Sequence, residues 1–318
     1  MVKKDNTTFR TSIGGQALIE GILMRGPEKQ AVVVRSPGGL VIREEKLKLV
    51  RDRYPILGLP LIRGGVTFLD SMFKGVKALM FSADYFPEED SGEPSKFEVW
   101  LNEKLGNERM EKLVIAVAVV LSVLFSVGLF MLLPTAIAGV VEWFTDSVLM
   151  RNLVDAVLRI AIFMTYLALV SRMKDIRRVF AYHGAEHKSI HCYEKGLELT
   201  VENVRAQSKH HPRCGTSFLV VVIIISILIN TIAFTVFPAP NLLVRILVQL
   251  LLLPVVVGIA YEFNRYVGAH DNPVTTFLAK PGLWMQKFTT CEPNDSMIEV
   301  AIEALKRVIP EEKGKDQW

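Results

Sequence analysis

A polar stretch between two long apolar runs carries the residue types best suited to bind a metal ion. His183, Glu186 and His187 form a His-x-x-Glu-His pattern, the reverse of the zincin order and that of the inverzincins. Successive residues of a helix turn by about 100°, so the two histidines lie on one face and can share a metal ion. Glu186 projects to the side, where a carboxylate can act as a general base. His191 and Glu194 continue the stripe as supporting or alternative ligands.

A second cluster, His210-His-Pro-Arg-Cys214, leads into a long apolar run. At the start of a helix, unsatisfied N–H groups and the helix dipole favour a thiolate, so Cys214 is a candidate ligand or nucleophile. Pro212 fixes the backbone after His211, which makes His211 the more constrained of the two histidines and a candidate ligand or base. Arg213 could stabilise a developing oxyanion. The alternative is a buried, inert cysteine beside ordinary helix-start residues.

Glu262 is the candidate for a third ligand. A catalytic zinc ion takes three protein ligands and keeps one position open. Glu262 ends the last apolar run, and a carboxylate there is costly unless it is paired or coordinated. Its alternative role is an interfacial carboxylate that faces water or pairs with Arg265.

Hydropathy predicts the elements that position these groups. The 318 residues have a mean hydropathy of +0.31 and are 50% hydrophobic, although 22% are charged. The apolar residues gather in runs long enough to cross a bilayer, at 113–133, 153–170, 216–236 and 242–261. The second run is the weakest because it contains Asp155 and Arg159, whose i, i+4 spacing allows them to pair. The expected fold class is mainly α and integral to the membrane: a four-helix transmembrane bundle with a small N-terminal α+β cytoplasmic region.

Three regions follow from these patterns. Residues 1–112 form the cytoplasmic N-terminal region, with a β-hairpin around 36–39, an amphipathic helix at 67–83 and a polar linker at 84–112. Residues 113–270 form the four-span membrane domain, and 271–318 the cytoplasmic C-terminal helices, in which Ser296 and Glu299 make a capping box. The glycine-rich stretch 13–27 predicts tight turns or close packing rather than nucleotide binding.

Basic residues set the expected orientation. Nine lysines and arginines lie in 171–215, whereas the other short connections carry at most one. The positive-inside rule then places this interval, the proposed site and both termini in the cytoplasm of a multi-pass cell-membrane protein. The charged N-terminus has no apolar core behind it, so no cleavable signal peptide is expected. Three cysteines do not suggest a disulfide framework and fit a reducing compartment.

The whole sequence resembles the YqhQ-like family of bacterial multi-pass membrane proteins, whose function is unknown. The resemblance covers nearly the entire chain through GGQALIEGILMRGP (14–27), HGAEHK (183–188), HPRCGT (211–216), YE (261–262) and PGLWMQ (281–286). The family is sometimes described as metal-dependent, without an established reaction. The resemblance therefore implies membrane placement more than chemistry.

Three functions compete on these residues. The leading hypothesis is a membrane-embedded metal-dependent hydrolase, a zinc peptidase at the cytoplasmic face. His183, His187 and Glu262 or His211 would hold the divalent metal, expected to be zinc, and Glu186 would be the base. The alternatives are a non-catalytic metal-binding scaffold or transport accessory protein, and a cysteine enzyme with Cys214 as nucleophile and His211 as base. The expected partners are membrane lipid and a protein, peptide or lipid substrate. Nucleic-acid binding has little support, because no basic patch is interleaved with aromatic residues, and the oligomeric state is open.

Overall fold

The computed structural model describes residues 9–48, 50, 54–86, 107–270, 272–312 and 314–317, with no side chains described at 107–112 and 142. The charged N-terminal residues 1–8 and most of the predicted linker, 87–106, lie outside these ranges. The chain divides into two compact units. Unit 1 is drawn from Met1–Phe86, Leu167–Ile229 and Leu252–Trp318, and unit 2 from Pro87–Tyr166 and Asn230–Leu251.

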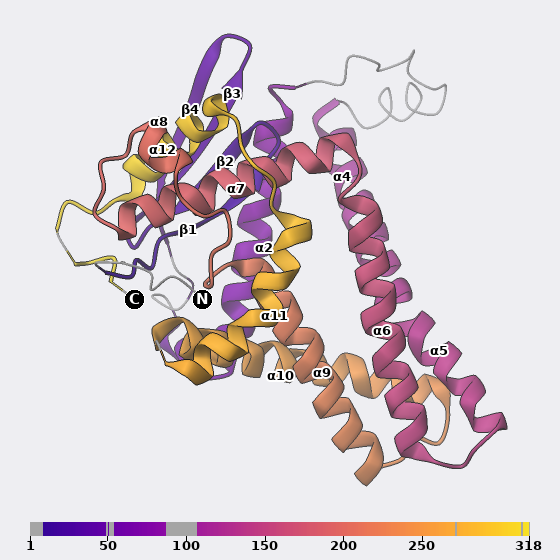
Figure 1. The fold of residues 1–318 in the computed structure, drawn as a ribbon. Helices are drawn as coiled ribbons and strands as arrows, with labels where there is room; N and C mark the ends of the chain where they lie inside the picture. The colour runs from indigo at the N-terminus through magenta and orange to yellow at the C-terminus, as the bar shows by residue number, and fades with distance from the viewer. Residues whose placement is uncertain are drawn as a thin grey trace. The chain divides into compact units, whose positions relative to one another are not determined.

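Unit 1 is built on a four-stranded antiparallel sheet with the order β1-β2-β3-β4 (Figure 1). The strands are β1 (Gly14–Leu18), β2 (Gly21–Arg25), β3 (Lys29–Ser36) and β4 (Gly39–Lys46). The predicted hairpin is confirmed, since Ser36 pairs with Gly39 across the turn. The glycine-rich stretch 13–27 forms the other hairpin, β1–β2, which the sequence patterns did not predict.

Alternating strand residues give the sheet two apolar faces. On one face, Ile22, Met24 and Val33 pack against α7 (Lys174–Glu194), α8 (Val201–Arg205) and α12 (Asp295–Val308). On the other face, Leu23 and Val32 pack against α2 (Ile62–Ala83). The sheet therefore lies between two helical layers, with α7 running across the β1 and β2 end.

The predicted C-terminal amphipathic helix is confirmed as α12, which buries Met297, Val300, Ala301, Ala304, Leu305 and Val308. Its cap differs from the prediction. Asn294 is the N-cap, and its side chain accepts a hydrogen bond from the backbone N–H of Met297. Asn is as good an N-cap as Ser and lies two residues earlier, so the helix begins at Asp295.

The predicted helix at 67–83 is longer than expected, because α2 begins at Ile62, after the 3₁₀ turn η1 (Pro55–Gly58). Its first turn lies directly on α10: a Cβ added to Gly64 would lie 3.0 Å from the Cα of Gly258. Further along, Phe68 contacts Phe218 of α9. Ile56, Phe73 and, on α11 (Pro273–Thr289), Phe277 leave most of their surface exposed.

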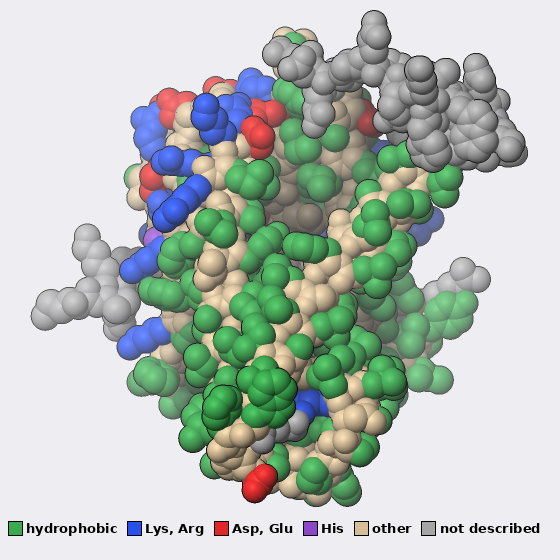
Figure 2. Space-filling view, turned by 90° about the vertical axis from the view of Figure 1, so that its right-hand side faces the viewer, with side chains coloured by type: hydrophobic (Ala, Val, Ile, Leu, Met, Phe, Trp, Pro, Cys, Tyr) green, Lys and Arg blue, Asp and Glu red, His purple; other side chains and the backbone are tan. Residues whose placement is uncertain are grey.

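Four helical segments are long and apolar enough to cross a membrane: Leu113–Gly139, α6 (Val148–Val170), α9 (Gly215–Val236) and α10 (Leu242–Ala269). The first comprises α4 (Asn107–Val127), the π-helical η2 (Gly128–Leu132) and α5 (Leu133–Gly139), and the 3₁₀ turn η3 (Val140–Trp143) follows it. These segments confirm that the four predicted apolar runs are helices of sufficient length, and three of the helices are longer than predicted by several residues. Hydrophobic side chains cover most of the face in Figure 2, whereas charged side chains gather mainly at its upper end.

Candidate metal site

His183 and His187 project from the same face of α7, as the helical spacing predicted. Each ring is fixed through Nδ1: His183 donates to the carbonyl of Thr289 (2.8 Å) and His187 to that of Lys209 (2.6 Å). A carbonyl oxygen can only accept, so Nδ1 carries the proton in both rings. The lone pair of the neutral imidazole is then on Nε2, the arrangement that backbone carbonyls impose on metal-binding histidines.

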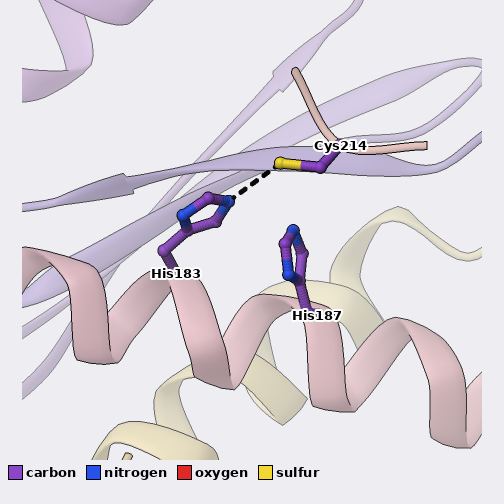
Figure 3. Close-up of side chains that lie close together, drawn as sticks. All are labelled: His183, His187 and Cys214. Carbon is purple, nitrogen blue, oxygen red and sulfur yellow. Dashed lines mark hydrogen bonds between the residues drawn. The ribbon is translucent and has the colours of Figure 1, made fainter. Parts of the chain in front are cut away.

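Cys214 supplies a sulfur atom opposite the two rings (Figure 3). It lies just before α9, and its Sγ is 3.1 Å from His183 Nε2. One ligand atom from each of His183, His187 and Cys214 lies within 4.8 Å of the other two. The structure therefore brings together two nitrogens and a sulfur, the donors that zinc prefers.

The three groups polarise one another. Burial alone would raise the pKa of the Cys214 thiol, but the charges of His187 and His183 and their hydrogen bonds hold it well below its usual value. Burial would lower the pKa of His183, yet the neighbouring Cys214, with Glu186 and the Thr289 carbonyl, raises it to about 9. In the absence of metal, Cys214 and His183 therefore each favour the charged form of the other.

Glu186 extends from the same helix toward β1. Its Oε1 accepts a hydrogen bond from the backbone N–H of Gly15 (2.8 Å). Its Oε2 is buried with no hydrogen-bond partner in the described part of the chain. Burial raises the pKa of this carboxyl group, and the charges of His183 and His187 oppose that effect. One carboxylate oxygen is therefore held and the other is available.

A cavity of about 90 Å³ adjoins these groups. It is lined by Glu186, His187 and Cys214 together with segment 11–15 and with Ile190, His211, Arg213 and Gly215. A volume of this size holds a few water molecules. The cluster therefore has room for a ligand or water at the position that three protein donors leave open.

His211 belongs to a second buried group, with His191 and Glu194, one to two turns further along α7. Its Nε2 lies 3.4 Å from Glu194 Oε2, and Arg213 pairs with the other carboxylate oxygen. Burial, with the positive charges of His191 and Arg213, lowers the pKa of His211 well below its usual value. The rings of His187 and His211 are 5.7 Å apart, so the two groups are neighbours.

Arg213 lines the cavity while its Nη2 binds Glu194. Its Nε is buried and has no hydrogen-bond partner among the described residues. The guanidinium therefore keeps one donor for a further acceptor.

Glu262 is placed elsewhere. Its carboxylate accepts hydrogen bonds from Arg63 Nε (2.7 Å) and Nη2 (2.5 Å) and from the backbone N–H of Leu61 (3.3 Å). Neither group of ligand atoms found in the described residues includes it. The carboxylate at the end of this span is thus paired, with Arg63 of α2 rather than with Arg265.

The sequence patterns missed the groups that hold the site in place. Backbone atoms of Gly15, Lys209 and Thr289 orient Glu186, His187 and His183, and no residue type encodes a backbone contact. Gly184 gives a partial signal: any Cβ there would lie 2.1 Å from the carbonyl oxygen of Cys291, so only glycine lets segment 289–291 approach α7. Gln286, part of the family motif, binds the backbone N–H and carbonyl of His211.

The fold and site define a mainly helical protein with four helices able to cross a membrane and a buried His–Cys–Glu cluster. The chain belongs to the family described as "Protein of unknown function (DUF1385)", which matches residues 59–311. It is 33% identical over 310 residues to "Uncharacterized protein YqhQ" of Bacillus subtilis (strain 168), covering 96% of this chain and 94% of that protein. No solved structure gives a significant match.

Proposed function

We propose that the protein is a membrane-embedded, zinc-dependent hydrolase with its site at the cytoplasmic membrane face. The observation that carries the proposal is that one ligand atom from each of His183, His187 and Cys214 lies within 4.8 Å of the other two. A cysteine acting as a nucleophile needs one histidine, whereas a metal site needs several donors with fixed tautomers. His183, His187 and Cys214 would be the ligands, and the proposal takes Cys214 in place of Glu262 as the third.

The surrounding groups suit hydrolysis. A zinc ion here would supply Lewis acidity and make water nucleophilic near neutral pH. Glu186 would accept a proton from water as the water oxygen attacks the carbonyl carbon of the substrate. Glu186 would then pass this proton to the leaving nitrogen as the C–N bond breaks. Arg213 Nε would donate to the developing oxyanion. A peptide is the proposed substrate, because an amide needs both a base and oxyanion stabilisation.

Metal content and activity test this proposal separately. We expect the purified full-length chain to bind about one zinc ion and to cleave a mixture of fluorogenic peptides. Glu186→Gln should keep the zinc, because the amide oxygen can still accept from Gly15, and lose about 10²- to 10⁴-fold in rate. Zinc loss in Glu186→Gln equal to that of a double histidine variant would move Glu186 into the ligand set. Zinc binding without cleavage of any probe would instead support the non-catalytic scaffold.

The second candidate is a cysteine enzyme, favoured by the 3.1 Å contact between Cys214 Sγ and His183 Nε2. In this candidate His183 replaces His211 as the base. Iodoacetamide separates the two candidates when its reaction is followed with and without zinc. Protection of Cys214 by zinc, with peptide cleavage lost on chelation, supports the metal enzyme. Cleavage that survives chelation but not alkylation supports the cysteine enzyme.

The proposed orientation puts segment 171–215 and both termini in the cytoplasm of a cell-membrane protein. The exposed apolar side chains of α2 and α11 would lie at the same membrane surface. Single cysteines at two exposed positions test this: an impermeant thiol reagent should label Asn241→Cys in intact cells and leave Lys174→Cys unlabelled until the cells are opened. The reverse pattern would invert the topology.

A further inference from the structure

Unit 2 contains a polar network inside its apolar helices. Asp155 and Arg159 of α6 pair at 3.1 Å, as their spacing predicted, and Thr135 of α5 bonds to both. Arg245 of α10 donates to Asn152 Oδ1 at 2.7 Å. All five side chains are buried. Polar groups at such positions are expensive and usually mark a function.

The charges in this network do not balance. Among the residues that the structure describes, Asp155 is the single carboxylate of the network, and its Oδ2 lies 3.1 Å from Arg159 and 3.9 Å from Arg245. The Arg159 pair is neutral by itself, so Arg245 contributes an excess positive charge. Its guanidinium also lies over the Phe234 ring, 4.5 Å from the centroid, which does not neutralise it. A buried charge of this kind needs a counter-ion.

The unsatisfied atoms of the network have one polarity. Arg245 Nε, Asn152 Nδ2 and Gln249 Nε2 are buried without a hydrogen-bond partner in the described part of the chain, and all three are N–H donors. Arg245 is 3% exposed and Asn152 4%. The Asn152 amide is fixed in this orientation because its oxygen accepts from Arg245. Donors beside an excess positive charge call for an anion with acceptor oxygens.

The depth of the network indicates which anion. Arg245 is the fourth residue of α10 and Asn152 the fifth of α6, each about 5–6 Å along the axis from the helix start. The 28 residues of α10 make a helix of about 42 Å, longer than a hydrocarbon core of about 30 Å. The apolar run of α10 also begins at Leu242, so its first turn lies at one end of the proposed span, close to the lipid phosphates. The two helix N-termini also favour negative charge.

We propose that Arg245 and Asn152 bind the phosphate of an anionic phospholipid headgroup. Arginine suits this ligand because its fork of N–H groups matches phosphate oxygens. Basic pockets between membrane helices bind such headgroups by the same chemistry. This inference does not depend on the proposed hydrolase.

The test compares the full-length chain in nanodiscs of phosphatidylcholine alone with nanodiscs that also contain phosphatidylglycerol. A second arm titrates inorganic phosphate onto protein in neutral detergent. We expect phosphatidylglycerol to raise the Tm by about 3–6 °C, and Arg245→Gln to abolish the rise. Arg172→Gln, which removes an exposed charge outside the network, should keep it. A rise with inorganic phosphate alone would keep the site and identify its ligand as free phosphate.

Asn152→Asp provides a second test in case Arg245→Gln fails to fold. This isosteric change puts a carboxylate against Arg245 and supplies the missing charge within the protein. It should raise the Tm in phosphatidylcholine and remove the further rise with phosphatidylglycerol. A merely structural network would change the baseline and leave the lipid-dependent rise intact. That result, or no rise with either phosphate probe in the unmodified chain, overturns the proposal.

Discussion

Unit 1 and unit 2 each bury a polar cluster, and the two clusters differ in the charge of the ligand that would complete them. Around α7, the groups that face one another are metal-ligand types, two imidazoles and the Cys214 sulfur, and Glu186 Oε2 is an acceptor without a partner in the described residues, although the neighbouring Arg213 Nε is an unpartnered donor. Around the starts of α6 and α10, the atoms without a partner in the described residues are the N–H donors of Arg245, Asn152 and Gln249. A buried polar atom without a partner is costly, so its polarity indicates the ligand that would satisfy it. The first cluster thus suits a cation and the second an anion.

The largest expected effect comes from removing the two histidine ligands proposed in unit 1. The double variant His183→Ala, His187→Ala leaves Cys214 as the only ligand, so zinc affinity should fall by at least about 10³-fold. Competition with a chromogenic chelator measures it. The matched control is His270→Ala, which removes an exposed histidine outside both clusters and should bind zinc normally. If the double variant also lost the phosphatidylglycerol-dependent rise in Tm, the two sites would not be independent.

The next test changes the packing of segment 289–291 against α7 and keeps all three proposed ligands. Gly184→Ala places a Cβ 2.1 Å from the carbonyl oxygen of Cys291, so segment 289–291 must shift from α7. We expect a loss of about 1–3 kcal/mol in unfolding free energy. Zinc affinity should fall as well, because the Thr289 carbonyl that orients His183 moves with that segment. Gly38→Ala, whose nearest neighbour atom is 3.8 Å away, should leave both unchanged.

The sequence predicted features that depend on residues close together in the chain better than features that depend on distant ones. Helical spacing placed His183, Glu186 and His187 correctly, because that relation is local to α7. The four long apolar helices and the Asp155–Arg159 pair followed from hydropathy and from i, i+4 geometry. The β1–β2 hairpin was missed because Gly14, Gly15 and Gly21 interrupt the apolar alternation that marks a strand.

Longer-range pairings were harder to predict. Glu262 was expected to need a partner, and it has one, but the partner is Arg63, 199 residues away in the chain. An apolar span predicts that its terminal carboxylate needs compensation without indicating the source. Cys214 was recognised as reactive, while its position among the histidines depended on how α9 and α7 meet. Residue types thus predicted which side chains could bind a metal ion, whereas the tertiary structure was needed to show which of them lie together.

Proton release on zinc binding tests the His183, His187 and Cys214 group in more detail. The neighbouring Cys214 raises the pKa of His183 to about 9 in the metal-free cluster, so this ring carries a proton at pH 7, while the two histidines hold the pKa of the Cys214 thiol well below its usual value. Zinc must therefore displace the His183 proton. Below pH 9 the apparent affinity should rise by about tenfold per pH unit, with about one proton released per zinc ion.

Cys214→Ser removes the main group that raises the His183 pKa. The variant should bind zinc more weakly and release less proton per zinc ion at pH 7–8. Calorimetry in buffers of different ionisation enthalpy measures both quantities. A proton count that is unchanged in Cys214→Ser would show that another group carries the displaced proton. Cys192→Ser, which changes a buried cysteine outside both ligand groups, is the control.

The smallest expected effect comes from Glu262, the carboxylate that follows the apolar run of α10. Unlike Glu186, it has both oxygens engaged, one by Arg63 Nη2 and the other by Arg63 Nε and the Leu61 N–H. If unsatisfied atoms are what indicate a ligand, Glu262 binds none. Glu262→Gln should then change zinc affinity by less than about threefold, far below the effect of losing a ligand. It should cost at most about 1 kcal/mol in stability, since both side chains of the pair are partly exposed. A zinc loss near that of the double histidine variant would return Glu262 to the ligand set, because a carboxylate satisfied by arginine would then have exchanged that partner for a metal.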